Sequence, residues 1–217
     1  MSKIKHLIFD LDDTIYPQSS RMSSQILRRI IEYSARFFNK SYDEILEIRK
    51  AELKKYVSTL WWLKSNGFKN DEEYFSYVHP AEEIKDLDFD PELRPFIESL
   101  PQPKVILTNS PSEHAEHVLE FLKVRDLFNK TISDIRRNDL RGKPFDISYR
   151  DALSIAGGSL EDTLFLDDYP YYIEGYAKLG GLCCLVGDAP YEIPQEYKNQ
   201  IFRIKTIYEL PSVLEKL

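Results

Sequence analysis

The chain has 217 residues, of which 42% are hydrophobic and 30% are charged, a balance typical of a globular protein with one ordinary domain and a smaller one. Its formal net charge of -7 argues against a nucleic-acid partner, because phosphate backbones are bound by clustered Lys and Arg side chains. The sequence contains neither the roughly 20 consecutive apolar residues of a membrane span nor the apolar block of a signal peptide near its N-terminus. We therefore expect a cytoplasmic protein without a membrane partner, and we leave its oligomeric state open.

Acidic side chains follow the first predicted strand, in the stretch KIKHLIFDLDDTIYP at residues 3–17. The apolar run 7–9 predicts a buried strand that ends at Asp10. Alternation along an extended chain places Asp10 and Asp12 on one side and Asp13 on the other. Two like charges so close together favour a bound cation, and Mg²⁺ prefers such hard oxygen ligands. Taken alone, however, the motif is more simply interpreted as an acidic turn that closes a strand.

The next segment changes from strand to helical periodicity. Apolar residues recur at spacings of four, three and four between residues 26 and 37, which predicts an amphipathic helix. Ser41 and Glu44 have the spacing of a capping box, so a second helix is expected to begin directly after Ser41. Residues 71–78 predict a further short helix. We therefore expect an all-helical insertion at residues 18–92.

Beyond the insertion, predicted strands alternate with predicted helices. The strands are expected at residues 104–107, 131–133, 163–166, 181–186 and 201–204. Such alternation implies a parallel sheet with right-handed crossovers and helices on both faces. The predicted fold class is therefore α/β, a three-layer Rossmann-like parallel sheet. Its core domain is discontinuous, formed by residues 1–17 and 93–217, with the helical domain 18–92 inserted between them.

Several predicted strands end in polar side chains. Thr108 and Asn109 follow the strand 104–107, and the acidic pair Asp167 and Asp168 follows the strand 163–166. Lys143 precedes a predicted helix. Ligands of open parallel sheets bind outside the carboxyl ends of the strands, so we expect these residues to meet the acids at positions 10 and 12. Individually, Lys143 could be a solvated loop lysine and Thr108 an ordinary strand-end hydroxyl.

Other polar residues of these loops are assigned structural roles. Ser110, followed by a proline and by Glu113, is expected to be the N-cap of a helix. His114, in the first turn of that helix, is expected to be a partly exposed surface histidine. Asp13 and Thr14 are expected to stabilise the turn after the first strand.

The order of these motifs resembles the haloacid dehalogenase superfamily, whose members carry a DxDx[TV] strand end, a Ser or Thr strand end, a Lys and an acidic pair. The resemblance covers most of the chain and implies a Rossmann-like core with the insertion as a C1 cap. More narrowly, FDLDDTIYP with a helical insertion directly after it, followed by ILTNSPSEHA, GKP and FLDDYPYYIEG, resembles the pyrimidine 5'-nucleotidase-like branch.

This resemblance implies a phosphatase mechanism. Asp10 would attack phosphorus and form an aspartyl-phosphate, and Asp12 would protonate the leaving alkoxide and then activate water. Thr108 and the backbone of Asn109 would bind phosphoryl oxygens, while Lys143 would offset the negative charge of the phosphoryl group and of the nucleophile.

The same resemblance implies Mg²⁺ as the cofactor. The expected ligands are Asp10, the carbonyl of Asp12 and Asp168, with Asp167 either as a further ligand or as a partner of the ligands.

The substrate is predicted from analogy alone. A small phosphorylated metabolite is expected, with a pyrimidine nucleoside 5'-monophosphate first and a phosphosugar or phosphoglycolate-like compound as the alternative. Tyr56, Trp61 and Trp62 are candidate specificity residues that could stack on a base, although ordinary packing inside the insertion is the simpler explanation for them. Tyr169 and Tyr172 depart from the pattern, since many relatives carry a small residue and an Asn or Asp there. This departure puts in doubt the support that Lys143 or the metal receives.

Four other functions remain open. A phospho-signalling receiver domain shares the residue types, but its Lys-Pro comes last, whereas Lys143-Pro144 here precedes Asp167-Asp168. A dehalogenase would need neither Asp12 nor a metal position at Asp168. A phosphomutase would keep every motif and transfer the phosphoryl group to a sugar. A non-catalytic scaffold would have no need of the complete motif set.

Overall fold

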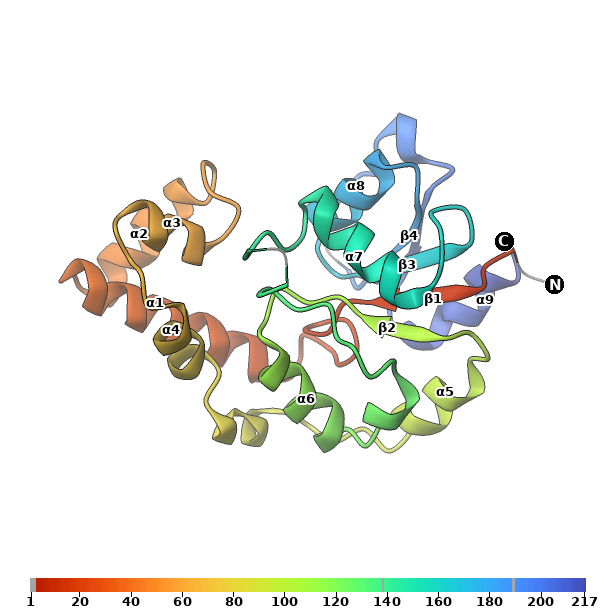
Figure 1. Cartoon of the computed structure of the whole chain (residues 1–217), viewed down its shortest axis with the longest axis horizontal. Helices are drawn as coiled ribbons and strands as arrows, with labels where there is room; N and C mark the ends of the chain where they lie inside the picture. Colours follow the sequence, from red (N-terminus) through yellow and green to blue (C-terminus); the bar gives the residue numbers. More distant parts are fainter. Residues whose placement is uncertain (1–2, 138, 189) are drawn as a thin grey trace. The chain divides into compact units, whose positions relative to one another are not determined.

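The computed structural model describes residues 3–137, 139–188 and 190–217 (Figure 1). The chain separates into two compact units. One unit, here called the core unit, contains the described residues up to Ser19 and from Phe89 onwards. The other, here called the insertion, is Ser20–Asp88. No helix within the described ranges is both long and apolar enough to cross a membrane.

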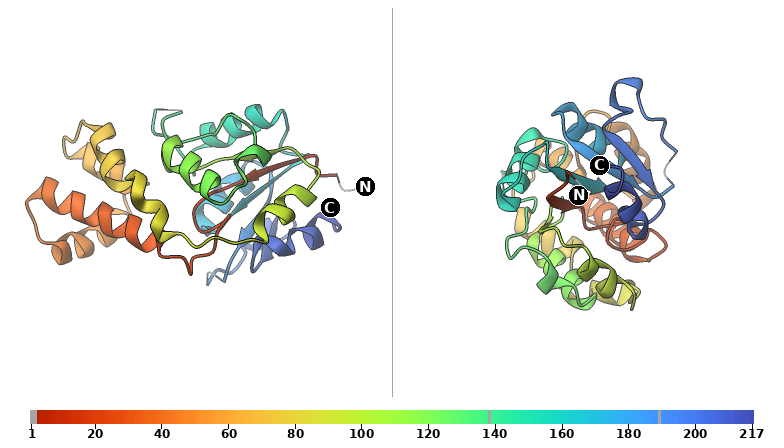
Figure 2. Two further views of the ribbon diagram at one scale, coloured as in Figure 1. Left: turned by 90° about the horizontal axis from the view of Figure 1, so that it is seen from below. Right: turned by 90° about the vertical axis from the view of Figure 1, so that its right-hand side faces the viewer.

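A parallel sheet organises the core unit (Figures 1 and 2). Its five strands lie in the order β2-β1-β3-β4-β5, and they are β1 (His6–Phe9), β2 (Lys104–Ile106), β3 (Thr163–Asp167), β4 (Leu182–Val186) and β5 (Ile201–Ile204). All neighbouring pairs are parallel, with Ile8 opposite both Val105 and Phe165. The carboxyl end of β1 therefore lies between those of β2 and β3.

Helices of the core unit lie on both sides of this sheet (Figure 2), which confirms the predicted α/β class. They are α5 (Leu93–Ser99), α6 (Ser112–Phe121), α7 (Asp146–Ala156), α8 (Pro170–Lys178) and α9 (Leu210–Leu214), with short 3-10 helices at Arg125–Leu127, Gln195–Tyr197 and Ile207–Glu209. The rings of Tyr149 in α7 and Tyr176 in α8 both pack against Phe165 of β3, at centroid distances of 5.6 and 5.3 Å. Burying a large apolar side chain contributes about 1.5–3 kcal/mol, so this aromatic trio anchors both helices to the sheet.

Two local predictions are wrong. Residues 131–133 do not form a strand, because within this stretch only Ser133 pairs with another segment, through a single parallel bridge to Leu107 just after β2. Ser110 is not the N-cap of α6, because the helix begins one residue later than expected and Pro111 occupies the cap position. The hydroxyl of Ser110 is therefore available for a contact elsewhere.

The insertion is helical, with α1 (Met22–Phe38), α2 (Tyr42–Glu52), α3 (Thr59–Ser65), α4 (Asp71–Val78) and the 3-10 helix Ala81–Asp86. The predicted capping box is confirmed, since the Ser41 N–H donates to Glu44 Oε2 at 2.8 Å and the Glu44 N–H donates to Ser41 Oγ at 3.3 Å. Helix α1 ends where Asn39 adopts a left-handed backbone conformation with φ of 51°. The local sequence thus specifies where α1 ends and where α2 begins.

The aromatic residues of the insertion hold its helices together. Ile31, Ile45 and Trp62 form a buried cluster, and the Trp62 ring stacks on Phe38 with a centroid distance of 4.6 Å. Tyr56 packs against this cluster and, with Trp62, lines a cavity of about 290 Å³.

Candidate active site

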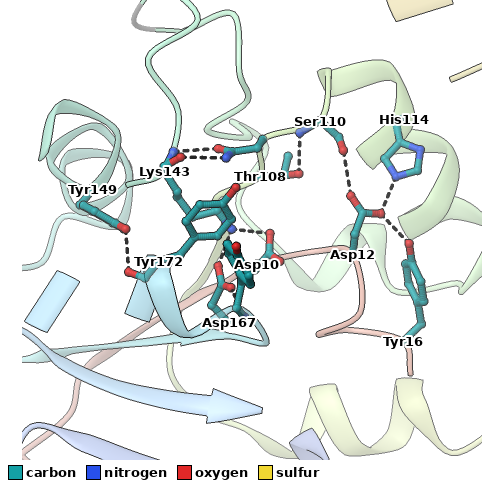
Figure 3. A network of polar contacts seen from close by, with 12 residues as sticks. Asp10, Asp12, Tyr16, Thr108, Ser110, His114, Lys143, Tyr149, Asp167 and Tyr172 are labelled. Atoms are coloured by element: carbon teal, nitrogen blue, oxygen red, sulfur yellow. Dashed lines mark hydrogen bonds and ion pairs between the residues drawn. The ribbon is translucent and has the colours of Figure 1, made fainter. Parts of the chain in front are cut away.

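The carboxyl ends of β1, β2 and β3 bring the predicted site residues to one edge of the sheet (Figure 3). Asp10 directly follows β1, and its N–H donates to Leu166 O in β3 at 2.8 Å. Thr108 lies two residues beyond the end of β2, and Asp167 is the last residue of β3. Because neighbouring parallel strands end at the same edge, residues 98 and 157 positions after Asp10 become its spatial neighbours.

Lys143 is the central charge of this edge. Its side chain is only 1% exposed, and Nζ lies 2.5 Å from both Asp10 Oδ1 and Asp167 Oδ2. Burial lowers the pKa of a lysine, but here the two carboxylates outweigh it and raise the Lys143 pKa above its usual value. The ammonium therefore stays charged and holds the two acids in fixed positions.

Asn109 holds the main chain of Lys143 in place. Its Nδ2 donates to Lys143 O at 2.9 Å, and its Oδ1 accepts from Lys143 N–H at 2.7 Å. This pair of hydrogen bonds joins the loop before α7 to the end of β2. A Cβ atom at Gly142 would lie 2.2 Å from Asn109 Oδ1, so the close approach requires glycine at that position. Sequence reasoning assigned a role to the Asn109 backbone and missed this role of its side chain.

Three carboxylates at this edge could hold a metal ion. Asp10, Asp167 and Asp168 each offer an oxygen, and these oxygens lie within 4.8 Å of one another. Burial raises the pKa of each of these acids to about 7; Lys143 opposes the shift, and repulsion between the acids adds to it. The single positive charge of Lys143 cannot balance these three carboxylates, so the cluster suits a hard divalent cation. Two of the predicted ligands, Asp10 and Asp168, belong to this group, and so does Asp167.

The carboxyl group of Asp12 is not part of the cluster formed by Asp10, Asp167 and Asp168, and it has its own set of polar neighbours (Figure 3). Tyr16 OH donates to Asp12 Oδ1 at 2.5 Å, and Ser110 Oγ donates to Oδ2 at 2.8 Å. His114 Nε2 lies 2.7 Å from Oδ1. Three side chains from different segments therefore orient this one carboxyl group.

The prediction of a surface position for His114 is wrong, because its side chain is fully buried. Helix α6 starts at the active edge and presents His114 and Ala115, one turn before Val118 and Leu119, toward the interior. The i, i+4 spacing of His114 and Val118 is the sequence signal that could have revealed this burial.

The two tyrosines that depart from the family pattern occupy different environments. The Tyr172 ring covers the ammonium of Lys143, with Nζ 5.1 Å from the ring centroid, and Tyr149 OH donates to Tyr172 O at 2.7 Å. Tyr169 contributes its backbone, since its N–H donates to Asp167 Oδ1 at 2.8 Å while the residue as a whole is 51% exposed. An aromatic face thus lies against Lys143 at the position where the family resemblance implies an Asn or Asp.

The remaining predicted residues take the following positions. Asp13 has a φ of 59°, a left-handed conformation that Asp tolerates in turns. This conformation agrees with its expected role in the turn after β1. Thr14 is buried beside it. Gln18 Nε2 donates to Asp168 Oδ2 at 3.1 Å, a contact that sequence reasoning missed. Trp61, in the insertion, is half-buried.

Comparisons with solved structures agree with this architecture. A HAD phosphatase from Thermococcus onnurineus aligns with a TM-score of 0.64 at 18% identity, over 97% of this chain and 98% of the other. A putative beta-phosphoglucomutase from Thermotoga maritima aligns with a TM-score of 0.61 at 17% identity, over 99% and 100%. A 2-haloacid dehalogenase from Pseudomonas syringae pv. Tomato DC3000 aligns with a TM-score of 0.62 at 19% identity, over 98% and 99%. At these identities the three structures establish the fold alone.

The family assignment comes from the sequence itself. A model of the haloacid dehalogenase-like hydrolases matches residues 4–180, a range that contains every strand-end motif of the site and all of the insertion. The protein therefore belongs to the haloacid dehalogenase-like hydrolases, an enzyme superfamily.

Proposed function

We propose that this protein is a Mg²⁺-dependent phosphomonoester hydrolase that acts through an aspartyl-phosphate on Asp10. The observation that carries the proposal is the division of acids into two groups at one sheet edge. Asp10, Asp167 and Asp168 form a cation-type cluster, whereas Asp12 stands apart with its own donors. A dehalogenase would need neither the second carboxyl group nor the cation cluster, but a phosphatase needs both.

Asp10 is the proposed nucleophile. One of its oxygens would attack phosphorus and form the aspartyl-phosphate while the bond from phosphorus to the ester oxygen breaks. Lys143, 2.5 Å from Asp10 Oδ1, fixes the attacking group and offsets charge that builds on the phosphoryl oxygens. Thr108, buried at the end of β2, and the N–H of Asn109 are the proposed donors to those oxygens.

Asp12 is the proposed acid and base. It would give its proton to the ester oxygen in the first step and would then take a proton from the water that hydrolyses the aspartyl-phosphate. The separation of the Asp12 carboxyl group from Asp10, Asp167 and Asp168 favours its role as acid and base, because a carboxylate that binds a cation does not exchange protons freely.

Mg²⁺ held by Asp10, Asp167 and Asp168, with the carbonyl of Asp12 as a further ligand, would neutralise phosphoryl oxygens next to the nucleophile. The raised pKa values of the three acids support this assignment, since a dication favours the ionised form that Asp10 needs for attack.

The insertion Ser20–Asp88 is proposed to act as a C1 cap that sets specificity, with Tyr56, Trp61 and Trp62 as candidate substrate contacts. The first proposed substrate is a pyrimidine nucleoside 5'-monophosphate. This choice rests on the resemblance of the motifs to the nucleotidase-like branch. A phosphosugar or a phosphoglycolate-like compound is the second choice, and transfer to a sugar, as in a phosphomutase, is the third.

An activity assay on a panel of phosphate esters and a 2-haloacid tests the proposal. Purified protein with Mg²⁺ is incubated with UMP, CMP, AMP, several sugar phosphates, phosphoglycolate and a 2-haloacid, and released phosphate or halide is measured. We expect phosphate release that Asp10→Asn abolishes and that excess EDTA stops. Halide release, or phosphate release that survives either treatment, rejects the mechanism. Failure on both pyrimidine nucleotides with turnover elsewhere rejects only the first substrate, and a stable phosphoprotein indicates a receiver-like function.

A further inference from the structure

The contact between His114 and Asp12 has no part in the mechanism described so far. His114 Nε2 lies 2.7 Å from Asp12 Oδ1, and the imidazole is fully buried while 24% of the Asp12 side chain is exposed. A buried histidine that contacts a partly exposed carboxyl group links the reacting end of the site to the interior of the protein.

Asp12 needs such a link because its own segment is irregular. The residues between β1 and α1 form turns, and a loop side chain has more freedom than one on a helix or strand. Tyr16, which also contacts Asp12, lies only four residues away in the same irregular segment, so this contact does not connect Asp12 to a helix or strand. Proton transfer requires heavy-atom distances of about 2.6–3.2 Å, which leaves little room for such movement.

Helix α6 supplies a fixed support for this carboxyl group. His114 lies in its first turn, next to Ala115, and the helix is held to the core by the buried side chains of Val118 and Leu119. The Ser110 hydroxyl approaches Asp12 from the loop that precedes the same helix, at 2.8 Å from Oδ2. The two contacts, one on each carboxyl oxygen, restrict both the position and the rotation of the group.

We propose that His114 is a positioning residue that orients the Asp12 carboxyl group for proton transfer to the leaving oxygen. The inference rests on the proposed phosphatase function and deepens it. In the affected step the bond from Asp10 to phosphorus forms and the bond from phosphorus to the ester oxygen breaks. The ester oxygen takes the proton of Asp12, which becomes a carboxylate. His114 keeps its own protons throughout and acts only through Asp12.

This role predicts a dependence on the leaving group. An alkoxide is a poor leaving group and needs the proton of Asp12, whereas p-nitrophenolate is stable enough to leave without it. We expect His114→Ala to lower kcat/KM for an alkyl phosphate by about 30-fold or more, which is part of the roughly 100- to 10,000-fold that general acid catalysis supplies. The same variant is expected to change kcat/KM for p-nitrophenyl phosphate by less than about 3-fold. The comparison uses kcat/KM because hydrolysis of the aspartyl-phosphate, common to both substrates, does not enter it.

The conservative variant separates orientation from volume. The amide nitrogen of a glutamine can occupy the place of a histidine Nε2, so His114→Gln is expected to restore most of the lost activity toward the alkyl phosphate. His117→Ala serves as the matched control, because it removes a histidine one turn further along the same helix. Its two kcat/KM values are expected to fall equally or not at all. Thermal unfolding and circular dichroism confirm that each variant is folded; where His114→Ala is not, His114→Gln and the double variant below decide.

A double variant completes the test. If His114 acts through Asp12, His114→Gln should have little further effect on either substrate once Asp12→Asn has removed the proton donor. Equal losses for both substrates in His114→Ala, or an undiminished effect in the Asp12→Asn background, overturn the inference while leaving the phosphatase proposal intact. A wild-type protein that releases phosphate from neither of these two substrates nor from any phosphate ester of the panel above overturns the phosphatase proposal instead.

Discussion

The ammonium nitrogen of Lys143 lies 2.5 Å from Asp10 Oδ1, and both side chains are largely shielded from solvent. A charge is costly to bury unless a partner compensates it, so each group makes the position of the other tolerable. This mutual dependence places the proposed nucleophile within a structural ion pair.

Removing the ammonium is therefore expected to affect stability as well as activity. In Lys143→Ala the carboxylates of Asp10 and Asp167 stay buried without their cation, and breaking such a pair costs about 3–5 kcal/mol. We expect a loss of this order in the free energy of unfolding, measured with urea in the absence of Mg²⁺, together with loss of phosphate release. Lys5→Ala is the matched control, because its salt bridge to Asp162 is solvent-exposed and contributes about 0–1 kcal/mol. Equal effects of the two substitutions contradict the prediction.

The acid cluster predicts that Mg²⁺ stabilises the protein in a pH-dependent way. The folded-state pKa of Asp10, Asp167 and Asp168 is about 7, above the unfolded value near 3.8. Between these two pKa values the folded protein binds more protons than the unfolded chain. The stabilisation that the protonated acids contribute is therefore fully present below about pH 4 and is lost as pH rises through 7. Mg²⁺ binds the ionised acids, so its stabilisation should be larger at pH 8 than at pH 5.5.

Thermal unfolding with and without Mg²⁺ at the two pH values checks this expectation. Taking the difference at each pH removes the contribution of other acids, such as Asp126, whose pKa is lowered to about 2 by its hydrogen bonds with Arg94. Asp168→Asn should reduce the Mg²⁺ effect at pH 8. An equal increase in the melting temperature at both pH values would count against the proposed ligands.

The close approach at Gly142 allows a third test. A methyl group there would collide with Asn109 Oδ1 and with Ile135 Cδ1, at 2.2 and 2.7 Å, and would push Asn109 away from the main chain of Lys143. Gly142→Ala is therefore expected to lower kcat by about 10-fold or more, as small misplacements in an active site do. Asn109→Ala removes one side of the collision, so Gly142→Ala should have a smaller effect in that background. Additive effects of the two substitutions exclude this explanation.

Much of the fold follows from local patterns. Alternating strands and helices were sufficient to predict the parallel sheet, and the topology then brings Asp10, Thr108 and Asp167 together at one edge. The capping-box signal at Ser41 identified the start of α2 because the interaction lies within four residues of the chain. The start of α2 is readable because the two residues of the capping box are close in sequence, whereas the sheet edge is readable because parallel strands end on the same side.

The surroundings of Asp12 were not predictable in the same way. Its partners come from a turn, a strand-end loop and a helix, and their meeting depends on how the loop after β1 folds back. Ser110 was assigned to a cap by its spacing, but Pro111 takes that position and the hydroxyl bonds to Asp12 instead. The burial of His114 is different, because its spacing from Val118 places it on the inner face of α6 and was readable from the sequence.

The capping box gives a fourth prediction, confined to the insertion. Ser41→Ala removes the acceptor of the Glu44 N–H and should lower the stability of the insertion by about 1 kcal/mol. Ser41→Gly should cost only a few tenths of a kcal/mol, since glycine is itself tolerated at this position. Urea unfolding followed by circular dichroism measures both. A glycine variant less stable than the alanine variant would show that the cap does not control this helix.

The ring of Tyr172 over Lys143 gives the last prediction. A cation 5.1 Å from a ring centroid gains about 0.5–2 kcal/mol, so the aromatic face is expected to stabilise the Lys143 ammonium in place of the Asn or Asp that the family resemblance implies. Tyr172→Phe keeps the face and should leave kcat/KM within about 3-fold of wild type, whereas Tyr172→Leu should lower it by up to about 30-fold, the factor that 2 kcal/mol represents. Tyr171→Leu, at a 49% exposed position in the same turn of α8, is the control and should have little effect on the reaction. If Tyr172→Phe is as impaired as Tyr172→Leu, the hydroxyl group supports the site and the ring does not.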